Sequence, residues 1–345
     1  MTITIFLSCK NQNKSFGRNL SKIWIRDIMV DSLRSIRAID LIDENIYYAC
    51  NDGRYGIVLE NGSKVIDNVK FDTLFPSFRS ITHTKNKLFI MSIESPALLY
   101  SYEKSKKHNA YIASQNIVYQ ENHPKAFYDS MEFWNDNEGI AIGDSTDGCL
   151  SVIITRDGGE TWNKLSCNDL PKGIENEGAF AASDTNIAIV GDNTWVATTA
   201  GRVYYSSDKG NTWSVFDTPI VKAKDTEGIY SIDFYDELNG FAIGGDYTKP
   251  DDNAANKIRT KDGGKTWELV AKNENPGYRS CVQYIPNRAG KELVAIGFKG
   301  IDYSNDSGST WKHLSDEGFY TIRFLNDSVA YAAGKGRISK LTFRE

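Results

Sequence analysis

Arginine, tyrosine and carboxylate side chains recur directly before a position that holds Ser, Thr or Ala at intervals of 41 to 52 residues. Arg binds carboxylates and phosphates through a rigid fork of N–H donors, so arginines gathered at one place favour an anionic ligand. The residues before the recurring position are Arg34, Arg79, Asp129, Gly178, Tyr230, Arg279 and Tyr320. Further polar candidates nearby in their repeats are Asp144, Glu177, Asp246 and Tyr247. The competing interpretation is that these arginines and carboxylates pair with each other and tie the repeats together.

The elements that position these residues are marked by a second repeat, Ser/Thr-x-Asp-x-Gly-x-Thr-Trp. It occurs four times, and its Asp residues are 51, 54 and 44 residues apart. Asp bonds the N–H groups of its own turn, Gly supplies a positive φ, and Trp begins the next strand. We name these segments the Asp-Gly-Trp turns and assign them a structural role. Their defining residues are Asp157, Gly159, Trp162, Asp208, Gly210, Trp213, Asp262, Gly264, Trp267, Asp306, Gly308 and Trp311.

The spacing of both repeats predicts an all-β fold. A propeller blade of four strands needs about 40 to 50 residues. The recurring position has seven members, which are Ser35, Ser80, Ser130, Ala179, Ser231, Ser280 and Thr321. The sequence therefore predicts a single seven-bladed β-propeller with four-stranded blades over residues 21–345. The last repeat has only three strands, and Ile23-Trp24-Ile25 is expected to supply the fourth and close the ring.

Propeller geometry separates the two repeats. The start of each innermost strand and the loop after the second strand lie at one end of the ring, and the turns between third and fourth strands lie at the other. The polar candidates are therefore expected around the mouth of the central channel, on the face opposite the Asp-Gly-Trp turns.

Composition excludes several function classes. The chain has 345 residues, is 40% hydrophobic and carries a formal net charge of −5, so the whole-chain balance gives no electrostatic support for binding nucleic acid or an anionic membrane. The four histidines are scattered and no Cys-x-x-Cys occurs, so we expect no metal site. Buried free thiols are favoured for the cysteines after Cys9, with one disulfide of undetermined pairing as the alternative.

The N-terminus departs from the repeat pattern. Residues 1–7 are apolar or Thr, and Ser8-Cys9 and a polar stretch follow. A short apolar run that ends in a small residue and Cys resembles the bacterial lipoprotein signal. We therefore expect residues 1–20 to be a lipoprotein-type signal and linker, Cys9 to be lipidated, and the protein to lie in the cell envelope, periplasmic or associated with the outer membrane. The alternative is a first strand with an incidental Cys.

The Ser/Thr-x-Asp-x-Gly-x-Thr-Trp motif resembles the Asp-box, or bacterial neuraminidase repeat, of sialidases and of the photosystem II stability/assembly factor family. Over about residues 30–341 the chain resembles bacterial relatives of that assembly factor, which are often labelled oxidoreductases. The segments that carry this resemblance are Lys125-Ala-Phe-Tyr-Asp-Ser-Met-Glu-Phe-Trp134, Gly143-Asp144, Gly178-Ala-Phe-Ala-Ala-Ser183, Gly228-Ile-Tyr-Ser231, Gly244-Gly-Asp-Tyr247 and Gly277-Tyr-Arg-Ser280. A Gly-rich strand-to-helix element is missing, so we expect no nicotinamide or flavin cofactor, and no other cofactor.

Two functions follow from the resemblance. The first is a non-catalytic, monomeric binding or assembly propeller whose partner is a protein or a small anionic or carbohydrate ligand, with no nucleic acid and with membrane contact only through a lipid anchor. The second is a sialidase-type glycoside hydrolase, in which Tyr230 or Tyr320 is the nucleophile, Glu177 its partner and Asp129 the acid/base. The Phe/Tyr-Arg-Ile-Pro motif typical of sialidases is matched only in part, by Phe78-Arg79-Ser80-Ile81.

Overall fold

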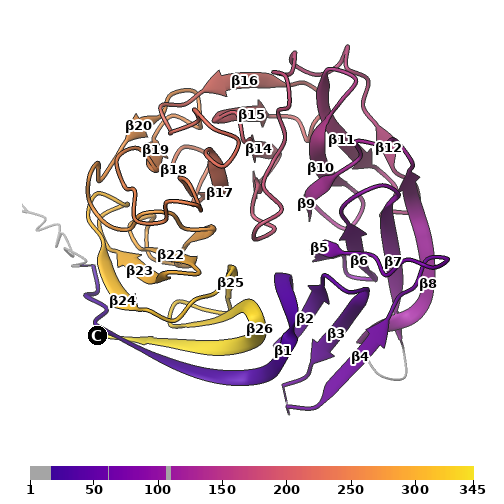
Figure 1. Cartoon of the computed structure of the whole chain (residues 1–345), viewed down its shortest axis with the longest axis horizontal. Helices are drawn as coiled ribbons and strands as arrows, with labels where there is room; N and C mark the ends of the chain where they lie inside the picture. Colours follow the sequence, from indigo (N-terminus) through magenta and orange to yellow (C-terminus); the bar gives the residue numbers. More distant parts are fainter. Residues whose placement is uncertain (1–16, 61, 106–109) are drawn as a thin grey trace, which may run out of the picture.

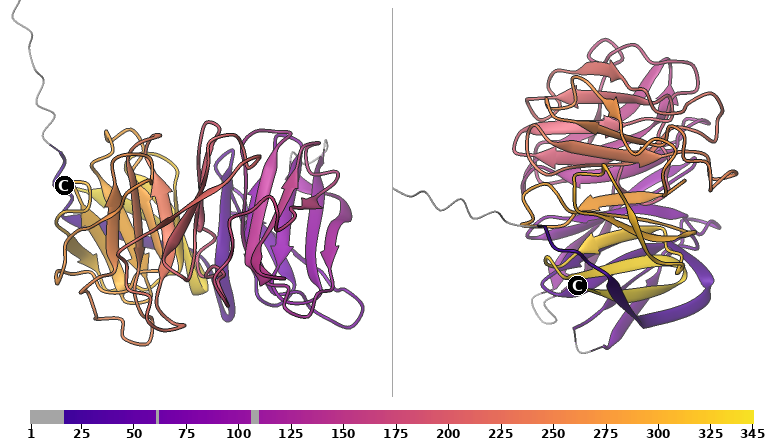
Figure 2. Two further views of the ribbon diagram at one scale, coloured as in Figure 1. Left: turned by 90° about the horizontal axis from the view of Figure 1, so that it is seen from above. Right: turned by 90° about the vertical axis from the view of Figure 1, so that its left-hand side faces the viewer.

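A computed structural model describes residues 17–60, 62–105 and 110–345, which form a ring of β-sheets around a central axis (Figure 1). The perpendicular views show the ring from the side, with its strands running between the two faces (Figure 2). The part of the chain that the structure describes has no helix of the length and apolarity needed to cross a membrane. The predicted lipidation at Cys9 lies outside the described residues.

The described strands form six hydrogen-bonded sheets, one of six strands and five of four. The first sheet runs β25 (Thr321–Phe324), β26 (Val329–Arg344), β1 (Lys22–Ile42), β2 (Asn45–Cys50), β3 (Arg54–Val58) and β4 (Lys64–Asn68). The second comprises β5 (Phe78–His83), β6 (Lys87–Ser92), β7 (Ala97–Ser105) and β8 (Ala110–Glu121), and the third β9 (Tyr128–Phe133), β10 (Gly139–Thr146), β11 (Cys149–Thr155) and β12 (Asn163–Lys164). The fourth comprises β13 (Ile187–Val190), β14 (Asn193–Ala197), β15 (Arg202–Ser206) and β16 (Ser214–Asp217). The fifth comprises β17 (Ile229–Phe234), β18 (Gly240–Gly244), β19 (Lys257–Thr260) and β20 (Glu268–Leu269), and the sixth β21 (Cys281–Tyr284), β22 (Leu293–Gly297), β23 (Gly300–Ser304) and β24 (Lys312–Ser315).

The prediction of an all-β propeller with four-stranded units is confirmed, but the prediction of seven blades is wrong, because the strands form six sheets. The difference arises where the first and last repeats meet. β1 is 21 residues long, and its residues 22–35 pair with β26 while its residues 36–42 pair with β2. Hydrogen bonds therefore join the first and last repeats into one sheet.

The N-terminal part of β1 closes the ring. Ile23 lies opposite Phe343 and Ile25 opposite Leu341, and these four side chains belong to one hydrophobic cluster. We name residues 22–27 of β1 together with residues 339–344 of β26 the closing ribbon. Figure 1 shows these two ends of the described chain side by side. Closure of the ring therefore depends on pairing between residues more than 300 positions apart in sequence.

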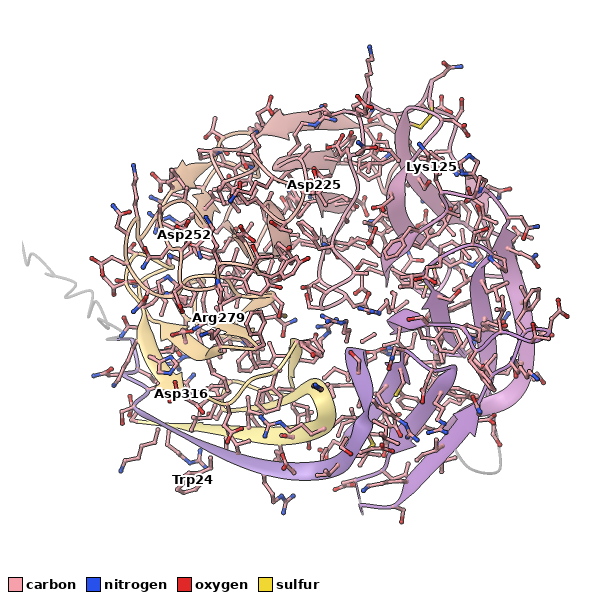
Figure 3. The ribbon with its side chains drawn as sticks, in the orientation of Figure 1. Trp24, Lys125, Asp225, Asp252, Arg279 and Asp316 are labelled. Atoms are coloured by element: carbon pink, nitrogen blue, oxygen red, sulfur yellow. A yellow bond between two sulfur atoms is a disulfide. The ribbon has the colours of Figure 1, made fainter. Side chains whose placement is uncertain are left out.

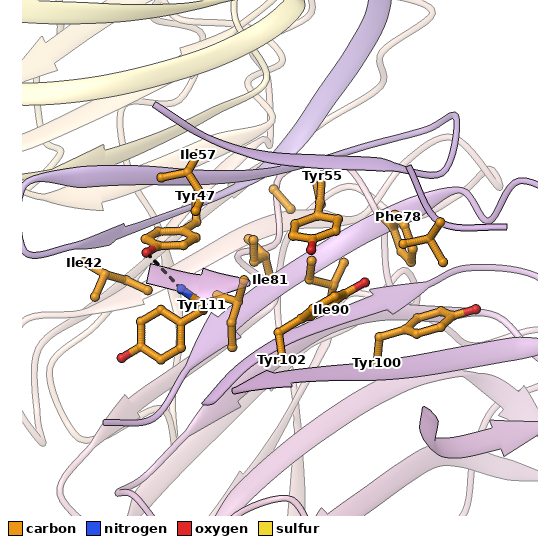
Figure 4. Close-up of a cluster of buried hydrophobic side chains, with 14 of the residues drawn as sticks. Ile42, Tyr47, Tyr55, Ile57, Phe78, Ile81, Ile90, Tyr100, Tyr102 and Tyr111 are labelled. Carbon is orange, nitrogen blue, oxygen red and sulfur yellow. Dashed lines mark hydrogen bonds between the residues drawn. The ribbon is translucent and has the colours of Figure 1, made fainter. Parts of the chain in front are cut away.

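Aromatic side chains pack between neighbouring sheets. Figure 4 shows one such cluster, in which the amide of Tyr111 donates to the hydroxyl of Tyr47 at 3.4 Å. On the other side of the ring Trp195 of β14 stacks on Phe234 of β17, with ring centroids 3.6 Å apart. Burying such large rings at the seams gives each sheet a specific partner, since offset and edge contacts add to the hydrophobic term.

In all four Asp-Gly-Trp turns the Asp carboxylate accepts from the Thr four residues later, as the second turn illustrates. The Trp indole donates to the Gly carbonyl in three of them, whereas the indole Nε1 of Trp162 is buried without a hydrogen-bond partner. Asp208 accepts hydrogen bonds from the amide of Thr212 at 2.8 Å and from its hydroxyl at 2.6 Å. Gly210 has φ +78°, and its carbonyl accepts from the indole N–H of Trp213 at 3.0 Å. Burial opposes ionisation of Asp208, but the Thr212 hydrogen bonds dominate and hold its pKa below the ordinary value. The Asp carboxylates of these turns form their hydrogen bonds within the turn, as a structural role requires.

The cysteines differ from the favoured expectation of free thiols. Cys149 at the start of β11 and Cys167 in the following loop form a disulfide with a Cα–Cα distance of 5.5 Å (Figure 3). Cys50 and Cys281 are buried and free. The disulfide ties the start of the segment between β12 and β13 to β11. The same segment contains Glu177, so the bond lies on the face that bears the polar candidates.

Candidate functional site

A pocket of about 390 Å³ opens on the face opposite the Asp-Gly-Trp turns. The starts of innermost strands and the loops after second strands provide its lining, as propeller geometry predicts. We name it the mouth pocket, and its lining residues are Arg37, Arg79, Phe127, Phe180, Ala181, Ala182, Tyr230, Tyr247, Tyr278, Phe298 and Tyr320. Four of these were predicted from the sequence, namely Arg79, Tyr230, Tyr247 and Tyr320.

Aromatic rings form one wall of the mouth pocket. Phe180 lies flat on Tyr230 with 3.7 Å between ring centroids and 4° between planes. Tyr278 meets Tyr230 edge-on at 4.7 Å and also contacts Phe298 at 5.5 Å. Tyr247 and Phe298 remain 49% and 42% exposed. Large rings left open to solvent on a concave surface are typical of binding sites for other molecules.

Two arginines also line the mouth pocket. A guanidinium N–H of Arg37 donates to the carbonyl of Ala182 at 3.1 Å, and one of Arg79 donates to the carbonyl of Ala181 at 3.0 Å. The Arg37 guanidinium also lies 3.9 Å from the ring centre of Tyr320. Among residues 17–60, 62–105 and 110–345, neither arginine has a carboxylate within 4.0 Å, and the Nε of each is buried without a hydrogen-bond partner.

The two arginines also raise each other's electrostatic energy. Burial, followed by repulsion from Arg37, lowers the pKa of Arg79 to about 10. An anion between the two guanidinium groups would remove this repulsion and satisfy donors that now lack partners. The pocket therefore combines unneutralised positive charge with aromatic surface.

Two predicted carboxylates lie beside the mouth pocket. Asp129 is fully buried, neither of its carboxylate oxygens has a hydrogen bond of normal geometry, and burial and the charge of Asp144 raise its pKa well above the ordinary value. Asp144 accepts a hydrogen bond from the amide of Ala179 at 3.2 Å, and burial raises its pKa to about 6. Asp144 lines a wider groove that shares Phe127 and Phe180 with the mouth pocket.

Other predicted residues form interactions within the protein. Arg279 donates to Asp302 from Nε at 2.7 Å, and Arg34 lies 2.9 Å from Asp31. Each of these two arginines therefore pairs with a carboxylate of its own repeat, and not with one of the predicted carboxylates in another repeat. Asp246 accepts from the hydroxyl and amide of Thr248, and these hydrogen bonds, opposed by burial, lower its pKa to about 2.

Two of the groups proposed for glycoside hydrolysis, Glu177 and Tyr230, form hydrogen bonds with other residues. Glu177 is buried, forms an ion pair with Arg202 and accepts a hydrogen bond from the hydroxyl of Tyr204 at 3.0 Å. The hydroxyl of Tyr230 donates instead to the carbonyl of Thr226 at 2.9 Å. Glu177 thus has its hydrogen bonds satisfied by residues other than Tyr230 and Tyr320.

A second pocket of about 430 Å³ is lined by inward-facing residues of the channel wall and by residues near the Asp-Gly-Trp face. Glu132, Asp184, Asp233 and Arg323 line it, and burial raises the pKa values of Asp184 and Asp233 to about 7. Within the described ranges, no group of three or more His, Cys, Asp or Glu side chains is arranged to hold a metal ion.

Sequence reasoning missed several residues of the mouth pocket, above all Arg37 and Tyr278. Arg37 stands three residues after the position expected to face the channel, and Tyr278 stands one residue before Arg279. The missing signal was the strand register. Ala38 lies opposite Ala49 across a bulge in β1, so Ala38, and not Ser35, holds the place in the first repeat that Ser80 holds in the second.

No protein-family model matches the sequence. No curated protein matches it either. Solved structures that match are β-propellers. They include YCF48, a photosystem II assembly factor, bound to D1 peptide, with 13% identity and a TM-score of 0.64 over 95% of this chain and 99% of that chain. They also include virginiamycin B lyase from Staphylococcus aureus, with 12% identity and a TM-score of 0.65 over 93% and 99%. YCF48 from Cyanidioschyzon merolae has 11% identity and a TM-score of 0.63 over 92% and 98%.

These likenesses show the propeller fold alone. A propeller scaffold hosts unrelated functions, so the function of this chain has to be argued from its own site.

Proposed function

We propose that this chain is a non-catalytic propeller of the cell envelope that binds an acidic segment of a partner protein in the mouth pocket. The carrying observation is that Arg37 and Arg79 line this pocket without a carboxylate within 4.0 Å among the described residues, together with several aromatic rings. A peptide with an Asp or Glu beside an apolar side chain would satisfy both the arginines and the rings. In YCF48, which shares the fold, a propeller is bound to a peptide.

The envelope location is part of the proposal. A disulfide between Cys149 and Cys167 favours an oxidising compartment, since thiols in the bacterial cytosol are kept reduced. Ser8-Cys9 adds the sequence resemblance to a lipoprotein signal. We also propose that the chain is a relative of the Asp-box assembly factors. In support, the same Thr-to-Asp hydrogen bond recurs in all four turns of this chain.

A peptide array tests the proposal. Purified protein is applied to peptides in which acidic and apolar residues vary independently, and we expect binders to carry both. The variant Arg37→Gln/Arg79→Gln should bind these peptides at least about tenfold more weakly, because each charge-assisted hydrogen bond contributes about 1.5–3 kcal/mol. The matched control is Lys85→Gln/Lys265→Gln, which removes two exposed cations elsewhere and should bind as the unchanged protein does.

Equal binding by the mouth-pocket variant and the control variant would contradict the proposal. So would turnover of a fluorogenic sialoside that is lost with Arg37→Gln/Arg79→Gln, because it would assign the mouth pocket to the glycoside hydrolase alternative. Partner proteins are then identified by a photo-crosslinking amino acid at Tyr247, which is half-exposed at the pocket rim.

A further inference from the structure

The closing ribbon presents a basic face to solvent. Side chains alternate along β1, so Ile23 and Ile25 pack into the core while their neighbours point outward. Residues directly opposite each other in an antiparallel pair share a face. The outer face therefore carries Lys22, Trp24 and Arg26 of β1 with Lys340, Thr342 and Arg344 of β26.

The four cations of this face are not neutralised. In the part of the chain that the structure describes, none of them has a carboxylate oxygen within 4.0 Å. Lys340 lies 6.0 Å from the ring centre of Tyr331. Burial and the charges of Glu44 and Glu60, opposed by that of Arg26, raise the pKa of this tyrosine. These two carboxylates are therefore near the face, although neither pairs with one of its cations. The ribbon contributes no acidic side chain to this face, because its one carboxylate, Asp27, alternates to the other face and accepts a hydrogen bond from the Ser339 hydroxyl at 2.6 Å.

Trp24 stands at the centre of the basic face. Its side chain is 63% exposed, the Arg344 guanidinium lies 5.6 Å from its ring centre, and Figure 3 shows it pointing away from the ring. Farther along β1, Val30 and Leu33 are 68% and 88% exposed. An indole ring with an apolar body and a polar N–H is suited to the headgroup level of a membrane, and the neighbouring cations are suited to its anionic lipids.

We propose that the outer face of the closing ribbon binds an anionic membrane surface directly, through Trp24 and its four cations. A membrane is favoured over nucleic acid because the Cys149–Cys167 disulfide points to an oxidising compartment, where membrane surface is present and nucleic acid is not. The whole chain has a net charge of −5, so a basic face on one side of the molecule would orient the propeller on an anionic bilayer. The inference does not depend on the mouth pocket.

Vesicle co-sedimentation at low ionic strength tests the inference. All proteins are full-length and carry Cys9→Ser, so that no lipid chain contributes. The unchanged surface should bind phosphatidylglycerol–phosphatidylcholine vesicles and not pure phosphatidylcholine vesicles. The variant Lys22→Gln/Arg26→Gln/Lys340→Gln/Arg344→Gln should bind at least about tenfold more weakly, since each cation near an anionic surface contributes to the attraction. Trp24→Ala should weaken binding even though it leaves the charge unchanged.

The control variant Lys85→Gln/Lys249→Gln/Lys265→Gln/Lys272→Gln removes the same charge from exposed positions elsewhere and should bind as the unchanged protein does. Circular dichroism melting curves establish that each variant is folded. Equal binding by the ribbon and control variants would overturn the inference. Binding of short duplex DNA that is lost with the ribbon variant, without binding to vesicles, would also overturn it and assign the face to nucleic acid.

Discussion

Asp184 offers a pH-dependent test of the channel structure. Its carboxyl is buried, one oxygen accepts from the amide of Ile81 at 3.0 Å, and the other has no hydrogen bond of normal geometry. The charged groups that act on it are Arg323, whose guanidinium lies 4.0 Å away, and Glu132. Burial outweighs the attraction of Arg323 and raises the pKa of Asp184 from 3.8 to about 7.

The sign of the effect follows from proton linkage. Because folded Asp184 binds its proton more tightly than the unfolded chain does, its contribution to stability is complete below pH 3.8 and is lost as the pH rises through about 7. At 1.36 kcal/mol per pKa unit, the loss amounts to at most about 4 kcal/mol. Asp184→Asn keeps an acceptor for the Ile81 amide and cannot ionise. The variant should therefore gain up to about 4 kcal/mol of stability, relative to the unchanged protein, between about pH 4 and pH 8.

Urea unfolding followed by tryptophan fluorescence, with the disulfide intact, measures this difference at both pH values. Comparing the two proteins at each pH cancels the titration of all other groups. Asp225→Asn is the control, because Asp225 is exposed and its substitution likewise replaces one carboxyl by an amide (Figure 3). A difference between the Asp184 variant and the unchanged protein that stays constant from pH 4 to pH 8 would refute the reasoning.

Three substitutions test the structural elements. Asp208→Ala removes the acceptor for the amide and hydroxyl of Thr212, and thermal unfolding should show a loss of about 1–3 kcal/mol. Cys149→Ser/Cys167→Ser opens a loop with a sequence separation of 18, and urea unfolding should show a loss of about 3 kcal/mol. Gly264→Ala places a Cβ 2.9 Å from a buried indole at a residue with φ +83°, and thermal unfolding should show a loss of more than about 1 kcal/mol.

Each of these substitutions has a control. Asp225→Ala should leave the melting temperature unchanged, and an equal effect of Asp208→Ala would contradict the account of the turns. Treating the unchanged protein with a reductant should reproduce the disulfide variant, and identical unfolding curves with and without reductant would count against the bond. Gly148→Ala has φ +96° but open space around the new Cβ, so it should cost less than Gly264→Ala.

The local features of the fold could be predicted from the sequence because they are short-range. In each Asp-Gly-Trp turn the residues that bond each other lie within four positions, so the motif itself specifies the hydrogen bonds. Spacing then sufficed for a propeller of four-stranded units. The predicted pairing of Ile23-Trp24-Ile25 with the last repeat is confirmed. The number of sheets differs because β1 continues unbroken from its pairing with β26 to its pairing with β2, and nothing in the repeat spacing indicates this continuity.

The candidate site was predicted only in part because it depends on register and rotamer. Arg79 and Tyr320 were found since their strands begin where the spacing places them. Arg37 was missed because of the bulge in β1. Arg279 does not line the mouth pocket, and its guanidinium lies 2.6 Å from Asp302 of β23 in the same sheet. In the fourth repeat the expected strand start, Ala179, lies in a loop, and β13 begins at Ile187. A loop of this length has no periodicity from which its course could be inferred.

The two strands of the closing ribbon are synthesised at different times, so the edge of β1 stays unpaired until the end of translation. β1 is made before every other described strand, and its partner β26 is made after all of them. Until β26 arrives, residues 22–35 have an unpaired edge, and Ile23 and Ile25 have no Leu341 or Phe343 to pack against. A chain that ends before β26 would therefore keep an unpaired strand edge with exposed apolar side chains, and proteases could cleave it there. In the complete chain, β26 covers this edge. Pairing with β26 is therefore what covers this edge of β1 and completes the ring.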